Sequence, residues 1–80
     1  MSKKYIVLAK RTCPFCVRAT SLLEEKGEDV SVIYFNESQQ SLLTEFKEAY
    51  QHHTVPMIFE RQNKNLKFIG GHDDLVEHVR

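Results

Sequence analysis

The chain is poor in cysteine, and this scarcity excludes several classes of protein. Its 80 residues contain two cysteines, Cys13 and Cys16, which lie three positions apart. A small secreted domain usually carries more cysteines, spread along the chain so that disulfides join distant segments. A bridge between these two closes almost no loop and therefore stabilises the fold very little. The pair is better explained by the chemistry of its thiols than by a structural role.

The sequence also lacks the ligand set of a zinc site. Zinc usually takes four protein ligands, and no second cysteine pair exists. Nitrogen ligands with a spacing that pairs with Cys13 and Cys16 are missing as well. The histidines of the chain are His52, His53, His72 and His78. We therefore predict redox chemistry at the cysteine pair and no metal site.

Long apolar runs and a charge of one sign are absent too. No segment approaches the roughly 20 apolar residues that a membrane span needs. The apolar run 5–9 is too short for a signal peptide and is followed at once by Lys10 and Arg11. Lys plus Arg equals Asp plus Glu, 11 each, so no net field attracts nucleic acid or a membrane surface. We expect one soluble, cytoplasmic domain over residues 1–80, monomeric and binding neither nucleic acid nor membranes.

The first half of the chain predicts a strand, a helix and a strand. The continuous apolar run 5–9 is typical of a strand buried on both faces. From Pro14, which suits a first helical turn, to the stop at Gly27 the apolar residues follow a helical period. They are Cys16, Ala19, Leu22 and Leu23. The β-branched and aromatic segment 30–35 predicts a second strand, parallel to the first through a right-handed crossover.

The second half predicts a helix, a hairpin and a last short helix. Ser38 or Ser41 is a candidate cap of the second helix, which has one apolar stripe. The stripe comprises Leu42, Leu43, Phe46, Ala49 and Tyr50. Segments 56–59 and 66–69 predict two strands joined by a turn at 62–65.

Gly70 and Gly71 interrupt the chain before the last helix, which begins at 72–74. Its buried side comprises Leu75, Val76 and Val79. The predicted order is βαβαββα, an α/β fold with helices on both faces of a four-stranded mixed sheet.

Cys13 is predicted at the start of the first helix, directly after a strand. Unpaired backbone N–H groups and the positive end of the helix dipole favour a thiolate there. Lys10 and Arg11 add positive charge, and together these effects lower the pKa of a cysteine. The thiolate is the species that attacks disulfides. We predict Cys13 as the nucleophile, Cys16 as a buried resolving thiol that releases the partner, and Phe15 as an apolar contact for a client.

Three separated motifs resemble the glutaredoxin family, especially its short bacterial or phage type, over essentially the whole chain. Residues 10–16, Lys-Arg-Thr-Cys-Pro-Phe-Cys, resemble the dithiol active site, with Phe15 where tyrosine is usual. Residues 54–56, Thr-Val-Pro, resemble the cis-proline segment, and residues 70–75 resemble the Gly-Gly-x-Ser/Thr-Asp-Leu/Phe segment. The resemblance implies a thioredoxin-like fold with three helices and a glutathione groove beside Cys13.

The resemblance also implies roles for single residues. Lys10 would pair with the glycine carboxylate of glutathione, and Val55 would hold the tripeptide backbone next to a cis bond. Asp74 would bind the γ-glutamyl ammonium, while helix N–H groups take its carboxylate. Asp73 stands where serine or threonine is usual, and His53 stands where longer members often have arginine. The implied groove residues are Lys10, Phe15, Thr54, Val55, Pro56, Gly71, Asp73 and Asp74.

The implied function is a glutathione-dependent thiol–disulfide oxidoreductase. Glutathione would be its reducing co-substrate, with no permanently bound cofactor. Protein disulfides and glutathione mixed disulfides would be its substrates, with ribonucleotide reductase as one client. A redoxin recharged by thioredoxin reductase is an alternative, although it would not need a tripeptide groove. Another alternative is a module that binds an iron–sulfur cluster between two subunits, which a rigid Pro14 and the presence of Cys16 disfavour.

Overall fold

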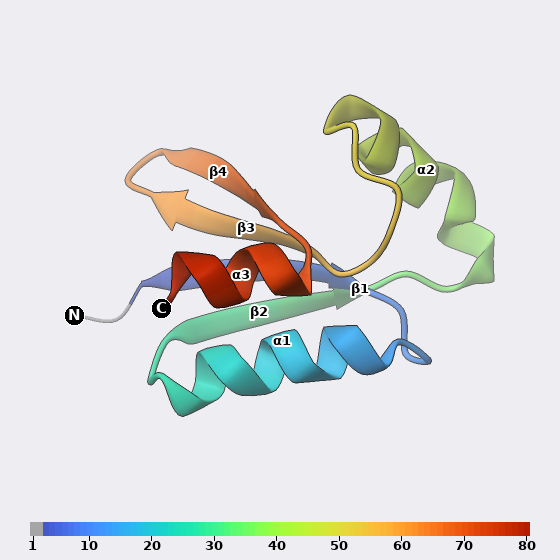
Figure 1. Ribbon diagram of the computed structural model, residues 1–80. Helices are drawn as coiled ribbons and strands as arrows, with labels where there is room; N and C mark the ends of the chain where they lie inside the picture. Colours follow the sequence, from blue (N-terminus) through green and yellow to red (C-terminus); the bar gives the residue numbers. More distant parts are fainter. Residues whose placement is uncertain (1–2) are drawn as a thin grey trace.

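A computed structural model describes residues 3–80 and contains the predicted order of elements (Figure 1). The elements are β1 (Lys4–Ala9), α1 (Pro14–Glu25), β2 (Asp29–Tyr34), the 3-10 turn η1 (Glu37–Gln39), α2 (Gln40–Ala49), β3 (Met57–Gln62), β4 (Asn65–Gly70) and α3 (His72–His78). The predicted βαβαββα arrangement is confirmed. Strand boundaries move by one to three residues from the predicted segments.

The sheet topology brings the cysteine segment and the segment before β3 together. The strand order is β2-β1-β3-β4, with β1 parallel to β2 and both other neighbouring pairs antiparallel. Because β1 and β3 run in opposite directions, Leu8 near the end of β1 lies opposite Met57 at the start of β3. Cys13, which follows β1, and Pro56, which precedes β3, therefore meet at one end of the sheet.

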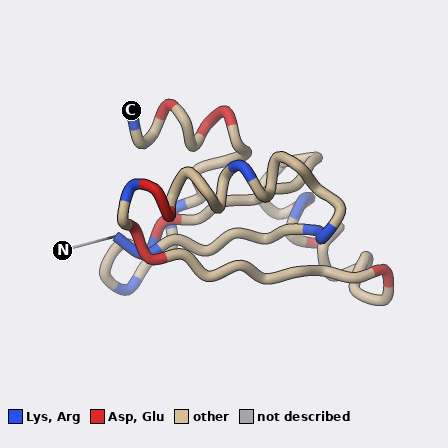
Figure 2. Tube along the Cα trace, turned by 90° about the horizontal axis from the view of Figure 1, so that it is seen from below, with Lys and Arg blue, Asp and Glu red and all other residues tan. Residues whose placement is uncertain are grey.

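Each face of the sheet has its own core, because alternate residues of a strand point to opposite faces. Helices α1 and α3 cover one face and α2 covers the other (Figure 1). The first core comprises Tyr5, Val7, Ala9, Cys16, Ala19, Leu23, Ile58 and Leu75. The second comprises Leu8, Phe35, Leu43, Met57 and Phe59. Figure 2 shows basic and acidic positions interspersed along the trace, in keeping with the balanced composition.

Helix α2 differs from its prediction at its start. Neither Ser38 nor Ser41 caps it, because the chain enters through η1 one turn earlier. Asn36 occupies the cap position of η1: its N–H donates to Gln39 Oε1 at 3.1 Å, and the Ser38 hydroxyl donates to Asn36 Oδ1 at 2.6 Å. Gln39 occupies the cap position of α2 and makes no side-chain cap hydrogen bond, so the serine cap predicted for this helix is wrong.

The predicted apolar stripe of α2 is only partly buried. Leu43 is fully buried and Phe46 is half-buried, whereas Leu42 and Ala49 are exposed. Tyr50 is also exposed on one side, while its ring packs on Phe59 and Phe68. The helix covers only one end of its sheet face, so a stripe of full width has nothing to pack on.

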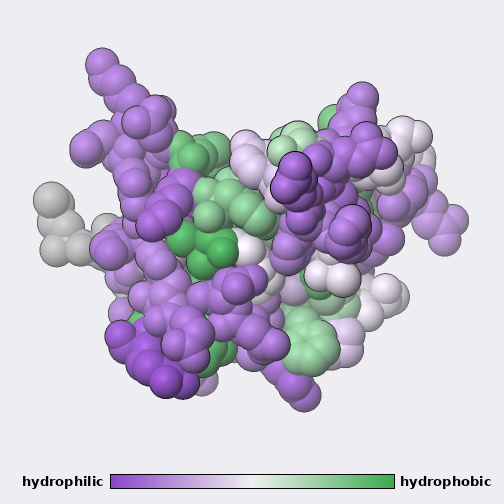
Figure 3. Space-filling model, turned by 45° about the horizontal axis from the view of Figure 1, so that its top comes forward, coloured by the Kyte–Doolittle hydropathy of each residue, from purple (hydrophilic) through white to green (hydrophobic). Residues whose placement is uncertain are grey.

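The uncovered part of this face is apolar in places. Ile33 and Leu66, which share the face with Phe35 and Phe68, are about half exposed. In the space-filling view of Figure 3, apolar side chains gather in the middle of the face with hydrophilic ones around them.

The hairpin that carries Leu66 turns more tightly than predicted, because Asn63 adopts a φ of 57° and both strands extend to the turn.

One buried carboxylate ties α3 to the sheet. Glu60 on β3 is 3% exposed, and its Oε2 lies 2.8 Å from the Tyr5 hydroxyl and 2.6 Å from His78 Nε2. Gln62 donates to Oε1 at 2.8 Å. Burial alone acts to raise the pKa of Glu60, but the hydrogen bonds from Gln62, His78 and Tyr5 outweigh it and lower this pKa to about 2. Burial, and then the bond to Glu60, raises the pKa of Tyr5.

Candidate active site

Cys13 begins α1 as its cap residue. Its backbone is extended, with φ −103° and ψ 105°, and Pro14 occupies the first helical turn. The Cys16 N–H donates to Cys13 Sγ at 3.1 Å, so an orphan donor of the helix end points at the sulfur. The same bond to a thiolate would stabilise its negative charge. The local structure thus supplies the environment that the sequence predicts for Cys13.

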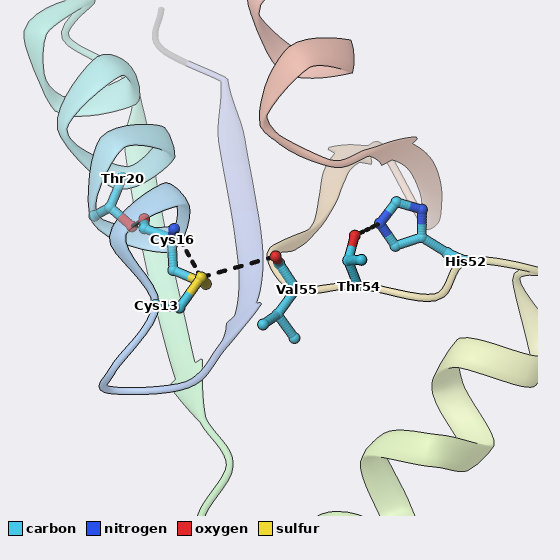
Figure 4. The surroundings of a disulfide bond; sticks show 6 residues. All are labelled: Cys13, Cys16, Thr20, His52, Thr54 and Val55. Carbon is cyan, nitrogen blue, oxygen red and sulfur yellow. Dashed lines mark hydrogen bonds between the residues drawn. A yellow bond between two sulfur atoms is a disulfide. The ribbon is translucent and has the colours of Figure 1, made fainter.

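The two cysteines form a disulfide, with their Cα atoms 5.2 Å apart (Figure 4). Cys13 is half-buried, whereas Cys16 is only 2% exposed and belongs to the core under α1. This asymmetry allows a partner to reach one sulfur and not the other. The burial predicted for Cys16 is confirmed.

The segment before β3 lies against the cysteine pair. The Val55–Pro56 peptide bond is cis, as the resemblance implies. The Val55 carbonyl oxygen lies 3.8 Å from Cys13 Sγ, and the two face each other in Figure 4. A chain laid along Val55 would therefore pass beside the accessible sulfur.

A groove of about 370 Å³ opens next to this segment. It holds all but one of the eight groove residues that the resemblance implies, drawn from α1, from the α2–β3 connection and from the start of α3. Its lining comprises Phe15, His52, Thr54, Val55, Pro56, Gly71, His72, Asp73 and Asp74.

Lys10 is the exception, because it lines a separate hollow of about 420 Å³. This second hollow lies at the β1–α1 connection and is also lined by Arg11, Thr12, Tyr34, Phe35, Asn36, Glu37 and Gln40. Thr12 and Phe15, which stand on either side of Cys13 in the sequence, line one hollow each. The structure therefore separates Lys10 from the other implied groove residues.

The two neighbouring aspartates at the start of α3 have different surroundings. Asp74 Oδ2 accepts the Gly71 N–H at 3.0 Å, so this carboxylate caps α3. Gly70 has a φ of 127°, and a Cβ at this position would overlap the Asp74 carboxyl group. The Asp73 side chain is fully exposed, with Oδ1 3.2 Å from His72 Nδ1. Asp74 thus has a structural role in addition to its place in the groove.

The sequence interpretation missed two histidines of the groove. His52 Nε2 lies 3.4 Å from Thr54 Oγ1, and a Cβ on Gly71 would meet the His52 ring at 3.5 Å. The His72 ring centroid lies 5.5 Å from that of Phe15. His53, by contrast, lines a different hollow, with Thr44, Lys47, Glu48 and Gln51. No signal in the sequence distinguishes His52 from His53, because only the packing of the α2–β3 connection decides which of the two faces the groove.

The surroundings of Cys13 carry opposite charges on its two sides. Lys10 and Arg11 stand on the β1–α1 connection, and Asp73 and Asp74 stand on α3.

Within residues 3–80, no three histidine, cysteine, aspartate or glutamate side chains are grouped so as to hold a metal ion. No helix in this part of the chain is long and apolar enough to cross a membrane.

The fold and the cysteine pair together define a dithiol protein with a thioredoxin-like fold. The family model of glutaredoxin matches residues 5–63, and the chain belongs to the glutaredoxin family. Glutaredoxin-C4 of Arabidopsis thaliana is 32% identical over 78 residues, which are 95% of this chain and 55% of that protein. The chain thus spans about half the length of this relative.

Solved structures of the family have the same fold. The dithiolic glutaredoxin 2-C-Grx1 of Trypanosoma brucei brucei has a TM-score of 0.76 and 40% identity, covering 96% of this chain and 77% of its own. A buckwheat glutaredoxin solved as a complex with glutathione has a TM-score of 0.79, covering 98% of this chain and 69% of its own. At 22% identity the latter shows the fold alone. Family membership and the cysteine pair support thiol–disulfide exchange as the chemistry of the site.

Proposed function

We propose that the protein is a glutathione-dependent thiol–disulfide oxidoreductase. The observation that supports this most is the groove beside Cys13, in which three separate segments of the chain meet. The acidic start of α3 on one side of Cys13 and the basic β1–α1 connection on the other suit a zwitterion with an ammonium at one end and carboxylates at both. The buckwheat relative, solved with glutathione, has the same fold.

Glutathione would lie across the groove with its sulfur toward Cys13 Sγ. Its γ-glutamyl ammonium would face Asp73 and Asp74, and its peptide groups would run along Val55. Its glycine carboxylate would reach toward Lys10, which lines the other hollow. This orientation uses both signs of charge that flank Cys13.

With a glutathionylated client, the Cys13 thiolate attacks the glutathione sulfur of the mixed disulfide. The Cys13–glutathione disulfide forms, and the client leaves as a thiolate that takes up a proton. A second glutathione thiolate then attacks the glutathione sulfur, releases oxidised glutathione and restores the Cys13 thiolate. This route consumes one free glutathione per turn, which leaves joined to the glutathione taken from the client, and it does not need Cys16.

With a protein disulfide, both cysteines take part. Cys13 attacks one client sulfur and the other leaves as a thiolate. Cys16 then attacks Cys13 Sγ, which forms the Cys13–Cys16 disulfide and releases the second client thiolate. Two glutathione thiols later reduce this disulfide. The two electrons that the client gains are those that the cysteine pair loses.

The test follows NADPH oxidation with glutathione, glutathione reductase and a glutathionylated peptide. We expect Cys13→Ser to abolish turnover, because it removes the attacking thiolate. Cys16→Ser should keep much of the turnover, since the mixed-disulfide route does not use Cys16. A wild type that is inactive with glutathione but accepts electrons from thioredoxin reductase would overturn the proposal in favour of the redoxin alternative.

Client, compartment and assembly are also part of the proposal. We propose a monomer in the cytoplasm, where a glutathione pool keeps thiols reduced. Ribonucleotide reductase is the client we propose to test first. The oxidised enzyme would regain activity with the wild-type protein and glutathione, and would not regain it with Cys16→Ser if its disulfide needs both cysteines.

A further inference from the structure

Two arginine–aromatic pairs flank the cysteine segment, and Phe15 of one pair also lines the groove. Arg11 Cζ lies 4.4 Å from the centroid of the Tyr34 ring, and Arg18 Cζ lies 5.2 Å from that of Phe15. All four side chains are exposed; Tyr34 is 42% and Phe15 is 49% accessible. We refer to Arg11, Tyr34, Arg18 and Phe15 as the arginine–aromatic rim.

The charges of the rim are uncompensated. Within residues 3–80, no carboxylate lies within 4.0 Å of either guanidinium. Stacking on a ring uses the flat face of a guanidinium and leaves its N–H groups, which lie in the plane, directed outward. These N–H groups match a carboxylate in a two-point geometry. Exposed aromatic rings beside arginine are also the composition of recognition surfaces.

The rim lies close to the reacting sulfur. Arg11 is two residues before Cys13, so their Cα atoms are at most about 7 Å apart. Arg18 is five residues after Cys13, mostly along helix α1, which places it at roughly 7–8 Å along the axis. An extended peptide advances about 3.3 Å per residue. Acidic side chains two to four residues from a client cysteine would therefore reach the rim while that cysteine contacts Cys13.

Other charged or titratable groups lie near the rim. Lys10 and Glu37 line the hollow of Arg11 and Tyr34, and they carry opposite charges. His72 contacts Phe15, with Asp73 beside it on the α3 side. Arg11 on the β1–α1 connection and Arg18 on α1 thus each keep a positive charge that no carboxylate of residues 3–80 pairs with.

We propose that the arginine–aromatic rim binds an acidic segment next to the reducible disulfide of a client protein. The inference rests on thiol–disulfide exchange at Cys13 but does not depend on glutathione as the reductant. Carboxylates of the client pair with Arg11 and Arg18, while apolar atoms of the segment cover Tyr34 and Phe15. Such contacts mainly raise the rate of productive encounter and select among clients.

The experiment measures single turnover with the full chain in the absence of glutathione. The protein is first reduced and freed of reductant, then mixed with an oxidised Cys-x-x-Cys peptide and quenched with acid. The readout is the ratio of second-order rate constants for a peptide flanked by glutamates and the same peptide flanked by glutamines. A substitution that changes the reactivity of Cys13 changes both rate constants by the same factor, so the ratio of the two stays the same.

We expect the wild type to reduce the glutamate peptide roughly threefold to tenfold faster at low salt. The preference should shrink as salt rises from about 20 mM to about 0.5 M, because exposed charges are screened. Arg11→Gln combined with Arg18→Gln should bring the ratio close to one. The matched control is Lys26→Gln combined with Lys64→Gln, which also removes two positive charges, one after α1 and one at the hairpin turn, at the opposite end of the sheet.

Three results would each overturn the inference. One is a wild-type ratio near one, and another is a ratio that the double arginine variant leaves unchanged. The third is an equal loss in the double lysine variant, which would assign the effect to overall charge. Failure of the glutathione-coupled assay alone would count against the proposed function and would leave this single-turnover result intact.

Discussion

At the scale of single residues, the site depends on a few positions where backbone and side chain constrain each other. Gly70 is one of them, because its φ of 127° lies outside the range of residues with a Cβ. An added methyl group would also overlap the Asp74 carboxyl group, which accepts the Gly71 N–H and caps α3. Gly70 thus permits the turn that places the start of α3 at the groove.

We expect Gly70→Ala to lower the free energy of unfolding by about 2–4 kcal/mol through backbone strain and overlap with Asp74. Urea unfolding followed by circular dichroism measures this change. Gly27→Ala is the matched control, since Gly27 also has a positive φ, 74°, but has open space around its Cβ position. Its loss should be about 1 kcal/mol. Equal losses in the two variants would contradict the role given to the Asp74 contact.

At the scale of elements, a small number of buried side chains hold α2 and α3 against the sheet. Leu43 is the one fully buried residue of α2, and α3 is held by Leu75 and by the bonds that Glu60 makes with His78. Both helices lead into or out of groove segments, because α2 precedes residues 52–56 and α3 starts at His72. Loosening either helix therefore affects the walls of the groove.

For α2, Leu43→Ala and Leu42→Ala form a matched pair on adjacent positions. Leu43 is 0% exposed and Leu42 is 47% exposed. We expect Leu43→Ala to lower the free energy of unfolding by about 2–5 kcal/mol, and Leu42→Ala by less than about 1 kcal/mol. The same urea titration compares them. Comparable losses would show that α2 packs through the full stripe that the sequence predicts.

For α3, the Glu60 cluster predicts a dependence of stability on pH. The pKa of Glu60 falls from an ordinary 4.5 to about 2 in the folded protein, so folding favours its charged form. The resulting stability is fully present above about pH 4.5 and is lost as the pH falls toward 2. By linkage the contribution is on the order of 3 kcal/mol.

Unfolding free energies of wild type and Glu60→Gln, measured at intervals between pH 7 and pH 2, check this expectation. The variant should be less stable at pH 7, and the gap should close in acid. Glu77→Gln is the control, because this carboxylate is largely exposed and pairs with Arg80 at the surface. A gap of constant size across the acid range would contradict the assigned pKa.

At the scale of the whole molecule, much of the fold was predictable because its signals are local. The period of apolar residues changes from strand to helix at Pro14, and glycine and polar turns mark the other boundaries. The Cys13 site was predictable for the same reason, since a cap, a proline and a resolving thiol lie within one turn. The single-domain extent of residues 1–80 stays a prediction.

Other features could not be predicted, because they depend on partners distant in the sequence. Glu60 directly follows the predicted strand 56–59, and its position in the sequence does not indicate burial. Its carboxylate is buried because Tyr5 on β1 and His78 on α3 form hydrogen bonds with it. The cap position of α2 falls on Gln39 instead of a serine, because η1 precedes the helix and is itself capped at Asn36. The open part of the α2 face reflects the length and placement of that helix rather than any one residue.

The sequence by itself determined the order of the elements, the placement of Cys13 at a helix start and the burial of Cys16, because short-range periodicity and capping control them. Only the tertiary structure decided which side chains share the groove. It brought His52 and His72 in, placed Lys10 in a separate hollow and turned His53 away. It also stacked Arg11 on Tyr34, across the β1–α1 connection and β2. These contacts join segments whose spacing along the chain carries no signal, so only the packing of the sheet and helices can bring them together.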